Sequence, residues 1–271
     1  MRRIDGALRA SADPFDRAVA DWLDALDALA PPERMARLVE DAVSTADARV
    51  YALAFRTCRL PREVPAGGSC DALSARRWAE LDRGNALPWV YVYAQARQSG
   101  DVSAQQEAMT RMAAADRFED RAYATAGAVA ERVPDEDDAL AAGIDLSVRA
   151  MGMSAAEMAP ISELTRACRQ QAEGDANLAQ QCRAVAERMF DRSDTILLRA
   201  VGGALYAQAT GDPSRRELAH EEQVAIASHW SPGTGLSECG SSRDLLRKFR
   251  REARVGELQA VRERLNEAIP P

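Results

Sequence analysis

Apolar residues recur along the chain at intervals of three and four, the spacing of one face of an α-helix. Two stretches illustrate the pattern: the apolar positions are Met158, Ile161, Leu164, Thr165, Cys168 and Ala172 in 155–173, and Leu178, Cys182, Val185, Met189 and Phe190 in 176–191. Alternating β-branched runs, which are typical of strands, are missing from the sequence. The pattern therefore predicts an all-α protein.

Proline, glycine and capping residues divide the chain into helices joined by short connections. The predicted helices are 14–29, 33–46, 49–57, 71–81, 87–99, 102–115, 118–132, 136–151, 155–173, 176–191, 194–210, 214–229 and 242–267, the last of which could break near Gly256. Helices joined by so few residues become antiparallel neighbours.

A Gly-Asp dipeptide recurs between helical stretches, at Gly100-Asp101, Gly174-Asp175 and Gly211-Asp212. The intervals are 174 − 100 = 74 and 211 − 174 = 37 residues, and 74 is twice 37. Gly can end one helix in the left-handed conformation, and Asp can cap the next helix. A period near 37 is typical of helix–turn–helix solenoids. An irregular helical bundle is the alternative.

We expect a single helical-repeat domain over 1–271, built as an antiparallel helix-hairpin array of the α-solenoid type. Within it, residues 1–70 supply N-terminal helices and 71–230 the repeat array. Residues 231–271 supply a loop and a C-terminal capping helix.

Residues 78–116 resemble one unit of the tetratricopeptide-repeat family. In that family a stretch of the form LDP-x-N leads into a first helix carrying Trp, and Gly follows eleven residues after the Trp. Here LDRGNALPW (81–89) ends in the Trp, and Gly100 stands eleven residues further on. Arg83 replaces the usual Pro, and Gln105 replaces a small residue expected early in the second helix. Outside this unit the chain is TPR-like by period only.

The resemblance implies a groove that binds peptides or proteins, lined by the first helix of the unit. The residues that this helix would offer are Val90, Ala94, Arg97 and Gln98. The Lys/Asn set by which some members clamp a peptide carboxylate is missing, so binding of chaperone tails is not implied. The segment from Cys58 to Trp89 is also loosely similar to envelope proteins of GC-rich gamma-proteobacteria, a resemblance that implies no activity.

Charge and hydropathy narrow the class of protein. The chain carries 35 basic and 42 acidic residues, a net charge of −7, and 46% of its 271 residues are hydrophobic. These values exclude a disordered chain and argue against a general nucleic-acid binder. No apolar run is long enough to span a membrane, and the N-terminus lacks the apolar segment of a signal peptide. Lys248 is the only lysine, which indicates a GC-rich bacterial genome.

The five cysteines suggest two disulfides. Cys168 and Cys182 lie level across the turn at Gly174, and Cys58 and Cys70 flank a Pro/Gly-rich loop. Two buried free thiols are the alternative for the first pair, since Cys packs as a small hydrophobe. Disulfides would favour a periplasmic or envelope location, with a leader already removed, over the cytoplasm.

The residues that carry chemistry are sparse. The two histidines, His220 and His229, fall on opposite sides of one helix, which excludes a shared metal site there. The acidic run Asp135–Asp138 opens a predicted helix, where carboxylates stabilise the helix dipole. Gly202-Gly203 lacks the phosphate-loop pattern. We expect no cofactor and no metal.

One helix, over 243–254, is strongly basic and amphipathic. Its residues Arg247 and Arg251 are candidates for contact with an acidic partner, although a solvated face on a capping helix explains the same pattern. The sequence as a whole predicts a non-catalytic protein–protein interaction module, a scaffold or adaptor whose partner is a protein or peptide. The alternatives are an inhibitor or immunity protein that sequesters a toxic enzyme, and an all-α enzyme.

Overall fold

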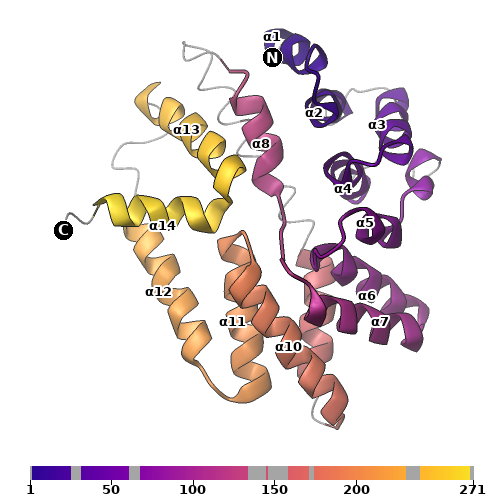
Figure 1. Ribbon diagram of the computed structural model, residues 1–271, viewed down its shortest axis with the longest axis vertical. Coiled ribbons are helices and arrows are strands. Elements are labelled where there is room, and N and C mark those ends of the chain that lie inside the picture. Colours follow the sequence, from indigo (N-terminus) through magenta and orange to yellow (C-terminus); the bar gives the residue numbers. More distant parts are fainter. Residues whose placement is uncertain are drawn as a thin grey trace. The chain divides into compact units, whose positions relative to one another are not determined.

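A computed structural model describes residues 2–25, 32–60, 68–133, 145, 158–170, 174–229 and 239–268. Within these residues the regular structure is helical, apart from two isolated β-bridges (Figure 1). The predicted all-α class is confirmed. The expected helix over 136–151 and its acidic opening at Asp135–Asp138 lie outside the described residues, apart from residue 145.

The helices carry the labels of Figure 1. They are α1 (Arg2–Arg9), α2 (Pro14–Ala25), α3 (Pro32–Ser44), α4 (Ala48–Thr57), the 3-10 helix η1 (Ser69–Ala72), α5 (Ala75–Leu81), α6 (Leu87–Ser99), α7 (Val102–Ala114), α8 (Ala122–Ala130), α10 (Ala176–Arg192), α11 (Ile196–Thr210), α12 (Ser214–His229), α13 (Cys239–Val255) and α14 (Glu257–Ala268). A further helix covers 158–170.

The chain forms two compact units, each assembled from three separate stretches. Unit 1 comprises Met1–Asp82, Ala122–Ala156 and Thr234–Arg254, and unit 2 comprises Arg83–Arg121, Glu157–Gly233 and Val255–Pro271. These boundaries differ from the subdivision 1–70, 71–230 and 231–271. The difference arises because α8 and α13, both remote in sequence, join the unit of the N-terminal helices.

Unit 1 is built on the buried face of α2, which packs against α3, α4 and α8. Trp22 and Trp78 are almost completely buried, and the ring of Trp78 lies 5.5 Å from that of Phe55. Helices α8 and α13 approach closely at Gly127, where an added Cβ would come within 2.1 Å of the Cβ of Ala253. A disulfide joins Cys58 to Cys70, as predicted.

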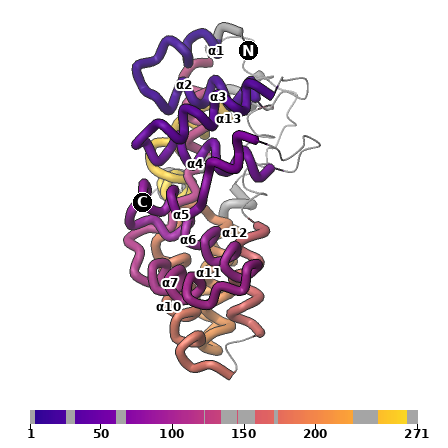
Figure 2. Tube along the Cα trace, turned by 90° about the vertical axis from the view of Figure 1, so that its right-hand side faces the viewer, coloured from indigo at the N-terminus to yellow at the C-terminus, as the bar shows by residue number. Residues whose placement is uncertain are grey.

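Unit 2 contains three pairs of consecutive helices: α6 with α7, 158–170 with α10, and α11 with α12. The members of each pair are joined across one of the Gly-Asp dipeptides. Gly100 and Gly211 end their helices in the left-handed conformation, with φ of 72° and 75°. Asp101 and Asp175 cap the helices that follow. In Figure 2, α6, α7, α10 and α11 lie side by side in the lower part of the trace.

Segments that connect these pairs run beside one another in unit 2. Arg117 forms a parallel bridge with Asn85, and Phe118 forms another with Ser193. The amide side chain of Asn85 donates to the carbonyl of Glu119 (3.0 Å) and accepts from the Glu119 amide (3.0 Å). The predicted helix 118–132 is therefore wrong at its start: helix α8 begins only at Ala122.

Asp194 fixes the end of this extended segment. Its carboxylate accepts the backbone N–H groups of Asp120 (2.9 Å) and Arg121 (3.0 Å). Burial raises the pKa of Asp194 to about 7, with repulsion from Asp120 acting in the same direction and the two amide hydrogen bonds opposing it. These bonds hold Arg121 in the left-handed region, at a φ of 54°.

Candidate binding groove

Helices α7 and α10 form the walls of a groove of about 860 Å³ in unit 2, and Tyr93 of α6 contributes to its lining. The two walls touch where Gln181 donates to the Thr110 hydroxyl (3.5 Å) and where Arg188 donates to the Ala113 carbonyl (3.1 Å). Because these contacts follow the same order along both helices, α7 and α10 run in the same general direction.

Uncharged polar side chains supply much of the lining. Five amides contribute to it: Gln105, Gln106, Asn177, Gln180 and Gln181. An amide offers two donors and one acceptor oxygen, so these walls can bind either kind of hydrogen-bonding group. Thr110 adds a hydroxyl, which donates to the Gln106 carbonyl one turn earlier (2.9 Å).

The floor of the groove is apolar. Tyr93 and Met109 line it although each is about 1–2% exposed, and Leu178 is half-buried. Burial raises the pKa of the Tyr93 hydroxyl, against the opposing hydrogen bond from Arg97. A ligand site combines apolar surface with a few placed polar groups, and this groove offers both, with a larger polar share than is usual.

One carboxylate, Asp175, lies in the lining. It is already engaged as the N-cap of α10, where it accepts the backbone N–H groups of Asn177 (2.9 Å) and Leu178 (3.1 Å). The described residues that line the groove include no Lys, Arg, His or Cys. The groove can therefore bind neutral polar groups through hydrogen bonds alone, without an ion pair.

Contacts behind the groove hold its walls in place. A disulfide joins Cys168 to Cys182, which ties the helix over 158–170 to α10, as predicted. Cys182 is fully buried and does not line the groove. On the other wall, Gln105 of α7 donates to the Ala96 carbonyl of α6 (3.2 Å). These links join each wall to its own partner helix.

The binding residues expected on α6 do not line this groove. Val90 and Ala94 are buried in the core, at 0% and 6% exposed, and neither lines the groove, so their prediction as groove residues needs correction. Arg97 is half-buried and pairs with Glu163 at 3.6 Å. Gln98 is exposed outside the lining. The resemblance suggested the first helix of the unit, whereas the second helix supplies the wall.

A signal for the groove does exist in the sequence. The triplet Ala-Gln-Gln occurs at 104–106 and again at 179–181, on the two helices that form the walls. The second copy begins 179 − 104 = 75 residues after the first, close to the 74 that separates Gly100 from Gly174. The repeat-family pattern marks Gln105 only as a departure from the usual small residue.

The basic helix α13 lies in unit 1, and most of its charges have defined contacts. Arg250 donates to the carbonyls of Ala130 and Val133 (both 2.9 Å), and Lys248 pairs with Glu252 at 3.5 Å. Arg247 is exposed and pairs with Asp244 one turn earlier. Arg251 is half-buried. A docking role for Arg247 and Arg251 stays a prediction.

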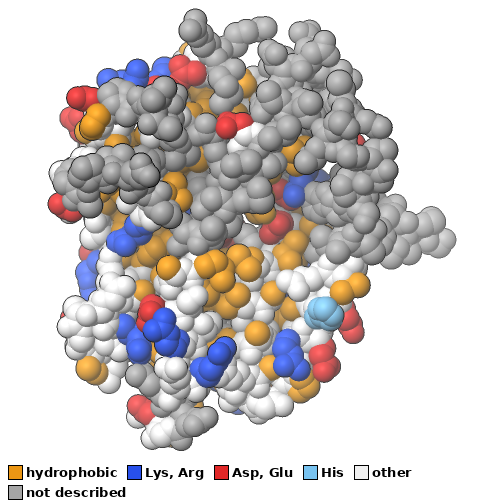
Figure 3. Space-filling view, turned by 180° about the vertical axis from the view of Figure 1, so that it is seen from behind, with side chains coloured by type: hydrophobic (Ala, Val, Ile, Leu, Met, Phe, Trp, Pro, Cys, Tyr) orange, Lys and Arg blue, Asp and Glu red, His pale blue; other side chains and the backbone are white. Residues whose placement is uncertain are grey.

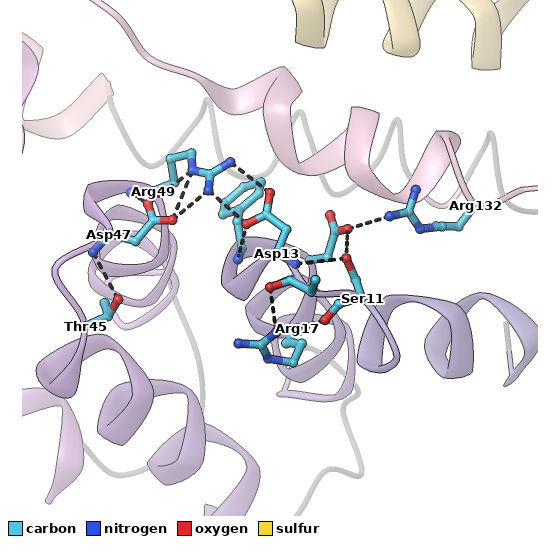
Figure 4. Close-up of polar contacts among 10 residues, drawn as sticks. Ser11, Asp13, Arg17, Thr45, Asp47, Arg49 and Arg132 are labelled. Atoms are coloured by element: carbon cyan, nitrogen blue, oxygen red, sulfur yellow. Dashed lines mark hydrogen bonds and ion pairs between the residues drawn. The ribbon is translucent and has the colours of Figure 1, made fainter.

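A second polar cluster, in unit 1, holds helix ends together (Figure 4). Arg49 donates to the carboxylates of both Asp13 (2.9 Å) and Asp47 (2.7 Å), and each of these carboxylates also caps a helix. Burial opposes ionisation of Asp47, but the hydrogen bonds from Arg49 prevail and lower its pKa. One guanidinium thus holds two helix-capping carboxylates together, so the cluster serves stability.

Charged side chains are also scattered over the surface. On the face drawn in Figure 3, described basic and acidic side chains lie among hydrophobic ones. Within the described residues no group of three or more His, Cys, Asp and Glu comes together to hold a metal ion. The described helices include none with the length and hydropathy needed to cross a membrane.

No protein-family model matches the chain, and comparisons with curated proteins and with solved structures find no match either. The case for function therefore depends on the geometry of this chain.

Proposed function

We propose that the protein is a non-catalytic protein–protein interaction module, a scaffold or adaptor that binds a polypeptide in the groove between α7 and α10. The observation that carries the proposal is the lining: five amides and a hydroxyl above a floor that includes Tyr93, Met109 and Leu178. A polypeptide presents matching amide groups and apolar side chains, so the lining suits it.

We also propose that unit 2 is a TPR-like array. Three helix pairs, each joined across a Gly-Asp dipeptide, support a repeated architecture. Stacked pairs of this kind create extended binding surfaces. The groove lies between equivalent elements of two pairs, the second helices α7 and α10, whereas the resemblance places the binding surface on the first helix.

The two disulfides support a periplasmic or envelope location. Disulfides persist in oxidising compartments and are rare in the reducing cytosol. The partner would then be sought among exported proteins.

The function is tested by closing the groove. Thr110→Trp places an indole in the lining, whereas Gln98→Trp places the same group on α6 at an exposed position outside it. Peptides selected by display against the wild-type protein should lose at least tenfold in affinity for Thr110→Trp and bind Gln98→Trp normally. Equal binding by both variants would contradict the proposal. Circular dichroism would verify that both variants fold.

A further inference from the structure

We propose that the groove binds an extended, uncharged stretch of polypeptide, about five or six residues long, through the amide groups of its main chain. The inference rests on the proposed function and specifies the chemistry of the partner. Three observations carry it: the amides of the walls, the balance of charge around them, and the length of the groove.

The amide side chains are placed to bind a main chain. Gln106, Asn177 and Gln180 are exposed in the lining. Gln105 and Gln181 are half-buried, and their donors already contact Ala96 and Thr110. An extended segment leaves its own N–H and C=O groups unsatisfied, and these groups would pair with the exposed amides. A helix satisfies those groups internally, so it would make little use of this lining.

The charge around the groove disfavours a strongly charged segment, above all an acidic one. The carboxylate of Asp175 caps α10, and the described lining offers no cation. Two arginines next to the lining are paired along their own helices: Arg111 with Glu107 (4.0 Å) and Arg183 with Glu187 (3.1 Å). An acidic side chain entering the groove would give up water without gaining a counterion, and that exchange is unfavourable. A basic side chain would meet a single carboxylate, Asp175, one oxygen of which already accepts two backbone N–H groups.

The dimensions fix the length of the segment. The lining follows α7 from Val102 to Ala114, which corresponds to about 18 Å at a rise of 1.5 Å per residue. An extended chain advances about 3.3 Å per residue, so about five or six residues fill this length. The apolar floor at Met109 and Leu178 would accept one apolar side chain of the segment.

The experiment uses three pools of hexapeptides, acetylated and amidated at their ends: one uncharged, one with Asp or Glu at two positions, and one with Lys or Arg at two positions. Each pool is selected on the full chain and identified by mass spectrometry. We expect enrichment from the uncharged pool alone. N-methylation of alternate backbone nitrogens in an enriched peptide should weaken its binding at least tenfold, because it removes main-chain donors.

Matched variants test the walls. Gln106→Leu and Gln180→Leu each remove an amide and keep a similar side-chain volume. Each should lower the affinity for the enriched peptides about 3- to 10-fold, the effect of about one net hydrogen bond. Gln98→Leu is the control, since Gln98 is exposed outside the lining and should leave binding unchanged. Unchanged binding by both wall variants would overturn main-chain recognition by the amides.

The two proposals fail in different ways. Enrichment from a charged pool, or tolerance of N-methylation, combined with loss of binding by Thr110→Trp, would refute the uncharged main-chain partner and leave the interaction function standing. No binding from any pool, or binding that Thr110→Trp does not change, would refute the groove as a peptide site and with it the proposed function.

Discussion

Gly202 and Gly203 lie where α11 passes between the helices on either side of it. An added Cβ on Gly202 would come within 2.5 Å of the backbone nitrogen of Phe190 in α10, and one on Gly203 within 2.8 Å of the Arg215 carbonyl in α12. Backbone atoms cannot move aside as a flexible side chain can. The pair therefore permits close packing on both sides of α11. The sequence showed only that Gly202-Gly203 lacks the phosphate-loop pattern and did not predict this packing role.

We predict that Gly202→Ala lowers the free energy of unfolding by about 3 kcal/mol, the upper range for overpacking. Urea denaturation followed by circular dichroism measures the change. Gly174→Ala is the control, because its added Cβ meets nothing within 4 Å and its φ is not positive. A loss at Gly202 no larger than that at Gly174 would show that α11 can shift away from α10.

The lowered pKa of Glu222 leads to a second prediction at the scale of single residues. Burial opposes its ionisation, but hydrogen bonds from Arg199 of α11 and Arg262 of α14 prevail and lower its pKa. A carboxyl whose pKa is lowered on folding stabilises the protein above its unfolded pKa, near 4.5, and this contribution is lost as the pH falls through the folded value.

Accordingly, Glu222→Gln should cost about 2 kcal/mol at pH 7, because it leaves the buried Arg199 without its counterion. The difference from the wild type should shrink as the pH falls below 4.5. Urea unfolding of both proteins between pH 3 and 7 measures it. Glu221→Gln, at an exposed neighbouring position, should show neither effect. A constant difference across this range would contradict the assignment.

At the scale of elements, the sequence predicted the ends of helices better than the contacts between segments that are distant in the chain. The sequence identified Gly100-Asp101 as a helix junction because left-handed Gly and capping Asp act within a few residues. It also predicted the break at Gly256, which has a φ of 83°. The extended segment before Ala122 was missed, since its partners Asn85 and Ser193 are distant in the sequence. The walls of the groove were missed for the same reason.

The disulfides connect the elements to function. We predict that the double variant Cys168→Ser/Cys182→Ser lowers the free energy of unfolding by about 3 kcal/mol, the loop-entropy value for a separation of 14 residues. The same variant should also bind the enriched peptides more weakly, because the Cys168–Cys182 bridge anchors α10, one wall of the groove. The variant Cys58→Ser/Cys70→Ser should destabilise to a similar degree with peptide binding unchanged, since that bridge lies in unit 1. Equal effects of the two variants on binding would contradict this.

At the scale of the whole molecule, the cysteines report the compartment. We predict a single adduct when denatured, unreduced protein from its native host is alkylated and weighed intact, because two bridges use four of the five cysteines. Five adducts would mean that the thiols are reduced where the protein works. That result would move the search for partners to the cytosol.

The last prediction follows from the way the two units alternate along the sequence. Residues 1–82 hold the N-terminal helices of unit 1, but α8 and α13 complete that unit from far along the chain. In the full chain, Arg132 donates to the buried carboxylate of Asp16 (2.6 Å), which also accepts from Ser11 (2.6 Å). A fragment of residues 1–82 would leave this charge without its counterion and the α8-facing side of α2 exposed. We therefore expect the fragment to show helical circular dichroism without the cooperative urea transition of the full chain. A sharp transition at the same midpoint would show instead that the N-terminal helices form a self-sufficient core.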